Sequence, residues 1–157
     1  MEGNEILEAV RNWLDDGSWN YRYEADKNCI HMGINLKCRL REAKIYVNFR
    51  ETNYLVYVVA PISGNKDDLG ELLRYVAMAN YGLIDGNFEL GCRDGEIRYK
   101  TFVNCEGLAS LPGEVILRSI FIGCSMMDRY GDGLAALAMG FSSAEDEIAK
   151  VEAKKED

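Results

Sequence analysis

The chain has 157 residues, of which 48% are hydrophobic and 28% charged, values that fit one soluble globular domain with its own core. Its formal net charge of -8 argues against nucleic acid and anionic membranes as partners, because both attract concentrated positive charge. No apolar run reaches the ~20 residues of a membrane span. The acidic start at residues 1–5 lacks the apolar core of a secretory signal, so we expect a cytoplasmic protein.

The cysteines are odd in number and include no C-x-x-C pair, which argues against a disulfide framework. We expect them to be buried thiols in a reducing compartment. A zinc site that combines them with His31 would need ligand pairs at short spacing, so no metal is expected. The five positions are Cys29, Cys38, Cys92, Cys105 and Cys124.

The first half of the chain predicts one helix followed by four strands. Apolar residues recur at helical spacing from Glu5 to Asp15, where Asn4 is placed to cap the helix. Period-two alternation then predicts strands joined by short polar turns. The strand at Tyr54 to Ala60 is apolar on both faces and ends at Pro61, which predicts cover on both sides, by helices or by a second subunit. The other three strands are expected near residues 21–24, 29–36 and 45–49.

The second half predicts a helix, a hairpin and a long third helix. The second helix is expected to open at residues 65–68 and to end at Asn80-Tyr81-Gly82. The third helix is expected to run from Pro112 toward Gly140, and Gly131-Asp132-Gly133 should interrupt or kink it, because each glycine costs ~1 kcal/mol inside a helix.

The hairpin from Gly86 to Lys100 is the strongest local pattern. Phe88, Leu90 and Cys92 alternate with polar residues, and Ile97, Tyr99 and Thr101 alternate on the return. Asp94-Gly95 between the two strands favours a type I′ turn. One face should therefore be apolar and the other charged, with cross-strand pairs among Glu89, Arg93, Glu96, Arg98 and Lys100.

Strands joined by short turns favour an α+β fold, an antiparallel sheet with three main helices packed on it in the order α-β-β-β-β-α-β-β-α. We expect one domain over residues 1–141. Residues 142–157 should form a charged C-terminal helix or tail, mostly solvated and frayed, which begins at a capping box at Ser142-Ser143.

A search for chemistry finds no constellation that carries a reaction. Phosphate-binding glycine loops and the G-x-S-x-G nucleophile motif are absent. Asp15-Asp16 and Asp67-Asp68 fall at helix ends, where capping explains them. Asp128 to Gly133 lacks the alternating ligands of a calcium loop. Cys29 and His31 share a strand face but lie too far apart for an ideal hydrogen bond, and His31 is expected to be a surface residue rather than a catalytic base.

Several of these stretches together resemble one family. The chain is similar to the YbjN-type family, labelled bacterial sensory transduction regulators, in order and spacing from about residue 80 to 140, while the first half matches only in its helix-then-strands layout. Gly91 stands where the family usually has an acidic residue. The matching stretches are Asn80-Tyr81-Gly82, Gly86 to Leu90, Asp94 to Lys100, Asp128 to Leu134, and Gly140.

The resemblance implies a fold like that of class I type III secretion chaperones, commonly paired as homodimers, and it implies no catalytic residue and no cofactor. We therefore expect a non-catalytic, chaperone-like or regulatory module that binds itself and an unidentified protein partner. The alternatives are a small-molecule or peptide sensor with a pocket between helix and sheet, and an enzyme with an unrecognised site. The candidate partner surface consists of Tyr54, Tyr57, Tyr99, Met126 and Met127.

Overall fold

The computed structural model describes residues 1–154, over which the chain forms four α-helices, one 3₁₀ turn and six strands. This is the α+β architecture that the sequence predicts. The elements are α1 (Gly3–Asp16), β1 (Arg22–Glu24), η1 (Ala25–Lys27), β2 (Cys29–Asn35), β3 (Glu42–Phe49), β4 (Asn53–Ser63), α2 (Gly70–Asn80), β5 (Asn87–Leu90), β6 (Glu96–Asn104), α3 (Gly113–Ala138) and α4 (Ala144–Ala153).

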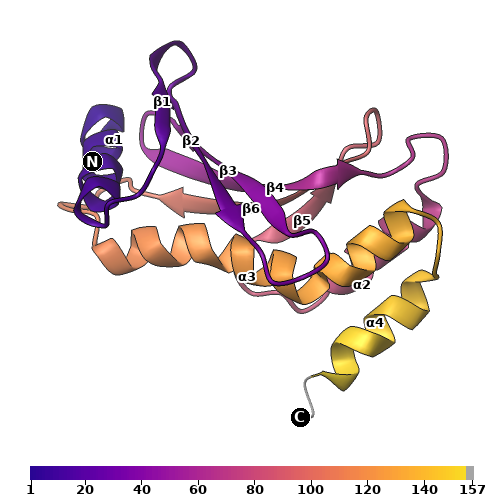
Figure 1. Ribbon diagram of the computed structural model, residues 1–157. Helices are drawn as coiled ribbons and strands as arrows, with labels where there is room; N and C mark the ends of the chain where they lie inside the picture. The colour runs from indigo at the N-terminus through magenta and orange to yellow at the C-terminus, as the bar shows by residue number, and fades with distance from the viewer. Residues whose placement is uncertain (155–157) are drawn as a thin grey trace.

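The strands form one antiparallel sheet in the order β1-β2-β3-β4-β6-β5. Helices α2 and α3 lie on one side of it, and α1 stands at one end (Figure 1). Within residues 1–154 no helix covers the opposite side. Strand β4 buries Tyr54, Val56 and Val58 beneath α3, whereas Tyr57 and Val59 on its other face are only half-buried. Helices therefore cover one face of this strand, not both.

Strand β4 also extends beyond the point where proline was expected to end it. It continues through Pro61 to Ser63, although its pairing with β6 becomes irregular between Val59 and Ser63. Proline lacks a backbone N–H, and this irregular stretch accommodates the missing hydrogen bond.

Helix α3 packs closely on the centre of the sheet because it carries a glycine at the contact. A Cβ atom added at Gly123 would lie 2.5 Å from Val58 Cγ2 and 3.3 Å from Tyr99 Cδ1. The helix also runs without a break from Gly113 to Ala138, so the expected interruption at Gly131-Asp132-Gly133 is wrong. Both of these later glycines are buried against neighbouring elements, and this packing outweighs their low helix propensity.

Two aspartates of α3 tie down the loop between β2 and β3. Asp128 Oδ1 accepts the backbone N–H groups of Lys37 at 2.6 Å and Cys38 at 3.1 Å. One turn later, Asp132 Oδ1 accepts the Arg39 N–H at 2.8 Å. These carboxylates satisfy backbone donors that a loop would otherwise leave unpaired, which gives the aspartates a structural use.

The hairpin between β5 and β6 has the expected inward residues but a different turn. Ile97, Tyr99 and Thr101 are buried, as predicted. A longer loop, residues 91–95, replaces the type I′ turn; within it the Gly95 N–H donates to the Gly91 carbonyl at 2.7 Å and Gly95 adopts a φ of 75°. The loop carries Cys92 into solvent, contrary to the prediction that it lies on the apolar face.

Helix α2 begins later than the sequence suggests. Its first residue is Gly70, and the expected start at residues 65–68 is instead a turn. The Asn65 side chain accepts the Asp67 N–H at 3.1 Å, and the Asn65 carbonyl accepts the Asp68 N–H at 2.9 Å. Asparagine competes in this way with helix formation by hydrogen-bonding its own backbone neighbours.

Helix α4 packs on α2 and α3 rather than projecting into solvent as a frayed tail (Figure 1). Ala144, Ile148 and Val151 are buried, and Ser143 caps the helix by accepting the Asp146 N–H at 3.3 Å. Most residues of α4 are exposed, as expected, but its apolar residues lie on one side, which the other helices bury.

We predict that Gly133→Ala destabilises the fold. The new Cβ would overlap the Tyr75 hydroxyl and lie 2.6 Å from Tyr75 Cζ. Tyr75 cannot simply move, because it is fully buried and donates a 2.9 Å hydrogen bond to the Tyr130 carbonyl. Overpacking costs about 1–3 kcal/mol, and the higher helix propensity of alanine offsets up to ~1 kcal/mol of this cost. The free energy of unfolding should therefore fall by about 1–2 kcal/mol.

Urea unfolding of both variants measures this effect. Gly70→Ala is the matched control, since nothing lies within 4 Å of a Cβ at that position, and its stability should stay unchanged or rise slightly. Equal shifts for the two variants would contradict the close contact at Gly133.

Candidate functional site

The face of the sheet that no helix covers is the first candidate site, and we call it the open face. The register places Tyr46 opposite Tyr57 and Leu55 opposite Phe102, so side chains from β3, β4 and β6 form continuous rows across it. Its members include Cys29, His31, Lys44, Tyr46, Asn48, Leu55, Tyr57, Val59, Glu89, Arg98, Lys100 and Phe102.

Aromatic side chains dominate the middle of the open face. The Arg98 guanidinium lies 4.3 Å from the centroid of the Tyr57 ring, and the His31 and Tyr46 rings stack at 6.0 Å. Phe102 lies near the end of β6, where only β4 pairs with it, and is 57% exposed, a high value for a large apolar residue. The face therefore offers rigid aromatic surface that a partner can cover.

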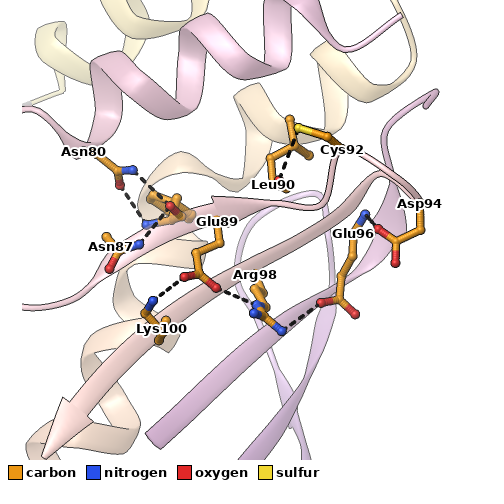
Figure 2. A network of polar contacts seen from close by, with 10 residues as sticks. Asn80, Asn87, Glu89, Leu90, Cys92, Asp94, Glu96, Arg98 and Lys100 are labelled. Atoms are coloured by element: carbon orange, nitrogen blue, oxygen red, sulfur yellow. Dashed lines mark hydrogen bonds and ion pairs between the residues drawn. The ribbon is translucent and has the colours of Figure 1, made fainter. Parts of the chain in front are cut away.

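Charged residues of the hairpin form a network along one side of the open face, as Figure 2 shows. Glu89 accepts hydrogen bonds from Arg98 Nε at 2.8 Å and from Lys100. Arg98 also donates to Glu96 Oε1 at 3.4 Å. The two pairs with Glu89 cross between the strands and confirm the charged hairpin face, although Arg93 lies in the exposed loop outside the network.

The outer edge of β5 is closed by asparagine side chains (Figure 2). Asn80 Nδ2 donates to the Phe88 carbonyl at 3.0 Å, and the Phe88 N–H donates to Asn80 Oδ1 at 2.7 Å. Asn87 Nδ2 adds a third bond to the same carbonyl at 3.1 Å. Because the backbone of Phe88 is fully engaged, this edge is a poor place to add another strand.

His31 lies on the open face with a carboxylate beside it. Its Nε2 is 3.1 Å from Glu24 Oε1, and Glu24 also pairs with Lys27 at 2.6 Å. The hydrogen bond from Lys27 is the main reason that the pKa of Glu24 is lowered. Burial raises the pKa of the nearby Cys29 thiol, which donates to the Ile30 carbonyl at 3.4 Å. A protonated thiol bonded elsewhere is not a nucleophile activated by His31.

Three of the five residues predicted to form the partner surface lie in the core instead. Tyr54 and Met127 are fully buried and Tyr99 is 1% exposed, so that part of the prediction is wrong. The Tyr54 hydroxyl forms a 2.9 Å hydrogen bond with Ser119 Oγ beneath α3, which satisfies it in the interior.

The other two predicted residues remain accessible, but the structure does not bring them together. Tyr57 lies on the open face and Met126 is half-buried on α3. Sequence reasoning missed Tyr46 and Phe102. The alternation that turned Ile97, Tyr99 and Thr101 inward also turned Phe102 outward, so the signal for it was present.

Two hollows beside α4 form the second candidate site. The apolar hollow has a volume of about 410 Å³ and lies between the ends of β4 and α3 and the α3–α4 connection. The basic hollow, of about 430 Å³, lies beside it, and Arg39, Glu147 and Lys150 line both. The apolar lining consists of Leu40, Ile62, Ala135, Ala136, Met139 and Phe141, and the charged lining of the basic hollow adds Arg129, Asp132 and Lys154.

Most of the cysteine thiols are buried, and burial disfavours their ionised form. Burial raises the pKa of Cys124 to about 12, and it also raises the pKa values of Cys38 and Cys105. Four of the five cysteines are buried, as predicted, and Cys92 is exposed.

Across residues 1–154 no three His, Cys, Asp or Glu side chains gather closely enough to hold a metal ion. None of the helices described is long and apolar enough to span a membrane.

Comparison with known proteins finds no family model that matches the chain and no curated protein that matches it. The open face and the pair of hollows are therefore the features from which a role is inferred.

We predict that Glu89 stabilises the protein above its titration range. Burial raises the pKa of Glu89, but the hydrogen bonds from Lys100 and Arg98 outweigh this and lower it below the ordinary value of 4.5. A lowered folded-state pKa adds stability that is present above the unfolded pKa and lost as the pH falls through the folded pKa. Glu89→Gln should remove this contribution, which we expect to be below ~1 kcal/mol for a partly exposed pair.

The test compares urea midpoints of the wild type and the variant from about pH 6 to about pH 3, a window around the carboxyl pKa. The wild type should be the more stable at pH 6, and the difference should shrink toward pH 3. Asp94→Asn in the adjacent loop is the control for a general change in charge. A gap between wild type and Glu89→Gln that stays constant with pH would contradict the assignment.

Proposed function

We propose that this chain is a non-catalytic protein-interaction module, chaperone-like or regulatory, that acts in the cytoplasm as a homodimer. The observation that carries the proposal is the open face, where no helix within residues 1–154 covers Tyr46, Tyr57 or the 57% exposed Phe102. Aromatic residues on a preformed surface lose little conformational entropy on binding and are enriched among residues that dominate interface energy.

The charges on the open face favour a protein partner over nucleic acid. Arg98 and Lys100 are already paired with Glu89 and Glu96, so they offer little net positive charge for a phosphate backbone. An aromatic centre with paired charges along one side is similar to the apolar core and polar rim of protein interfaces.

The similarity to the YbjN-type family supports the same proposal, since it implies homodimers with a chaperone-like fold. Several residues that carry this similarity have structural roles here. Asn80 holds the β5 backbone, and Asp128 and Asp132 hold the β2–β3 loop. The similarity therefore speaks mainly to the fold, and the open face supplies the separate argument for binding.

A second candidate function, a sensor of small molecules, is favoured by the apolar hollow. Its volume of about 410 Å³ falls within the range of ligand sites, and it lies between helices and the end of a strand. Binding there would involve a different part of the molecule from the open face.

Light scattering over a dilution series tests the proposed homodimer. The wild type should have a mass near twice 17.7 kDa. Phe102→Asp should shift the protein toward monomer, because burying an unpaired charge in the interface costs at least ~2 kcal/mol, roughly a 30-fold rise in the dimer dissociation constant. The matched control is Ile84→Asp, since Ile84 is 99% exposed and lies in the loop before β5.

Circular dichroism and the urea midpoint serve as the check that both variants remain folded. A monomeric wild type at every concentration would refute the homodimer. A dimer that Ile84→Asp and Phe102→Asp leave equally intact would exclude the open face as its interface.

A further inference from the structure

We propose that the apolar hollow and the basic hollow form one binding site for a small amphipathic anion, a molecule with an acidic head group on an apolar tail. This inference rests on the second candidate function and names its ligand class. The main support for this proposal is that the two hollows share a wall. Arg39, Glu147 and Lys150 line both of them, so the apolar hollow lies directly beside the positively charged one.

The apolar hollow is suited to an uncharged chain. Leu40, Ile62 and two alanines of α3 form its walls, and Met139 and Phe141 also line it. These last two side chains are 65% and 76% exposed. If these two exposed side chains covered a ligand, the burial of apolar area would favour binding by about 25 cal/mol for each Å² removed from water.

The basic hollow carries more positive than negative charge, and its acids are already engaged. Glu147 is 4% exposed and accepts a 2.6 Å hydrogen bond from Lys150. Asp132 accepts the backbone N–H of Arg39, and its second oxygen lies 3.8 Å from Lys154. Four cations thus face two carboxylates in a chain whose net charge is -8.

Two of these cations lack a carboxylate partner among the residues that the structure describes. Within residues 1–154, neither Arg39 nor Arg129 forms an ion pair. Arg129 lies 5.3 Å from the centroid of the Tyr130 ring, and Arg39 is exposed on the loop that α3 holds in place. Guanidinium groups bind carboxylates and phosphates through paired hydrogen bonds, so an anionic head group is the complementary ligand.

A cationic head group is the less complementary choice. The acid nearest the apolar hollow is Glu147, whose carboxylate already has Lys150 as its partner. An amine that entered would have to displace this lysine and would then lie beside Arg39 as well. The arrangement therefore selects for the sign of the charge as well as for an apolar tail.

Four probes with the same tail and different heads test the proposal by isothermal titration of the full chain: octanoate, octyl phosphate, 1-octanol and octylammonium. At least one of the two anions should bind about tenfold or more tighter than 1-octanol, because one hydrogen bond to a charged group changes a dissociation constant by about that factor. Octylammonium should bind more weakly than 1-octanol. The ratio between octanoate and octyl phosphate distinguishes a carboxylate ligand from a phosphate ester.

Three variants at the hollows and one control variant locate the binding. Arg39→Met should weaken the anionic probes about tenfold or more and leave 1-octanol unchanged. Arg93→Met, in the exposed hairpin loop, is the charge-matched control and should bind like the wild type. Phe141→Ser should weaken all probes that bind, and since this side chain is 76% exposed the variant should remain folded. Ala136→Trp, which fills the apolar hollow, should abolish binding, with circular dichroism as the check on folding.

Each other outcome overturns the proposal. If no probe binds, the hollows are not a ligand site, and the homodimer experiment on Phe102 decides the interaction module independently. If 1-octanol or octylammonium binds best and Phe141→Ser weakens it, the sensor function stands but the anionic ligand class is wrong. If Arg39→Met and Arg93→Met behave alike, the basic hollow does not hold the head group.

Discussion

The contact between α3 and the centre of the sheet is the constraint on which the other features of this molecule depend. Gly123 lets the helix lie directly against Val58 and Tyr99, where any larger side chain would force the two layers apart. The same helix then reaches the β2–β3 loop, which Asp128 and Asp132 fasten to it. This packing covers one face of the sheet. The opposite face and the far end of α3 are then the surfaces available for binding.

The strands and their inward faces could be predicted because period-two alternation is a local property of the sequence. Tyr99 illustrates both the strength and the misuse of that signal. The pattern places it on the apolar face of the hairpin, where it is buried, so it cannot also belong to an exposed partner surface as the sequence analysis proposes. Phe102, three positions later, has the opposite orientation and the exposure that Tyr99 lacks. Alternation was the better guide than residue type.

Features that depend on distant parts of the chain could not be predicted in the same way. Gly133 looked like a helix breaker because its propensity is low, but Tyr75, far away in sequence, occupies the space where a side chain would be. The apolar hollow likewise draws on Leu40, Ile62 and Phe141, which only the docking of α4 and the β2–β3 loop brings together. No short-range pattern in the sequence predicts that these residues lie together, although each can be recognised as a lining residue once the fold is known.

The two candidate sites are separated by the geometry of a single strand. Strand β4 contributes Tyr57 to the open face, whereas Ile62, within its irregular stretch, lines the apolar hollow beside the helices. Side chains on a strand point alternately to opposite sides, so one element can serve two surfaces that do not overlap. A partner on the open face and a small ligand beside α4 would therefore meet no steric conflict. Because the ligand would touch the end of the strand that carries Tyr57, any change that it imposed on β4 would have a direct physical route to the open face.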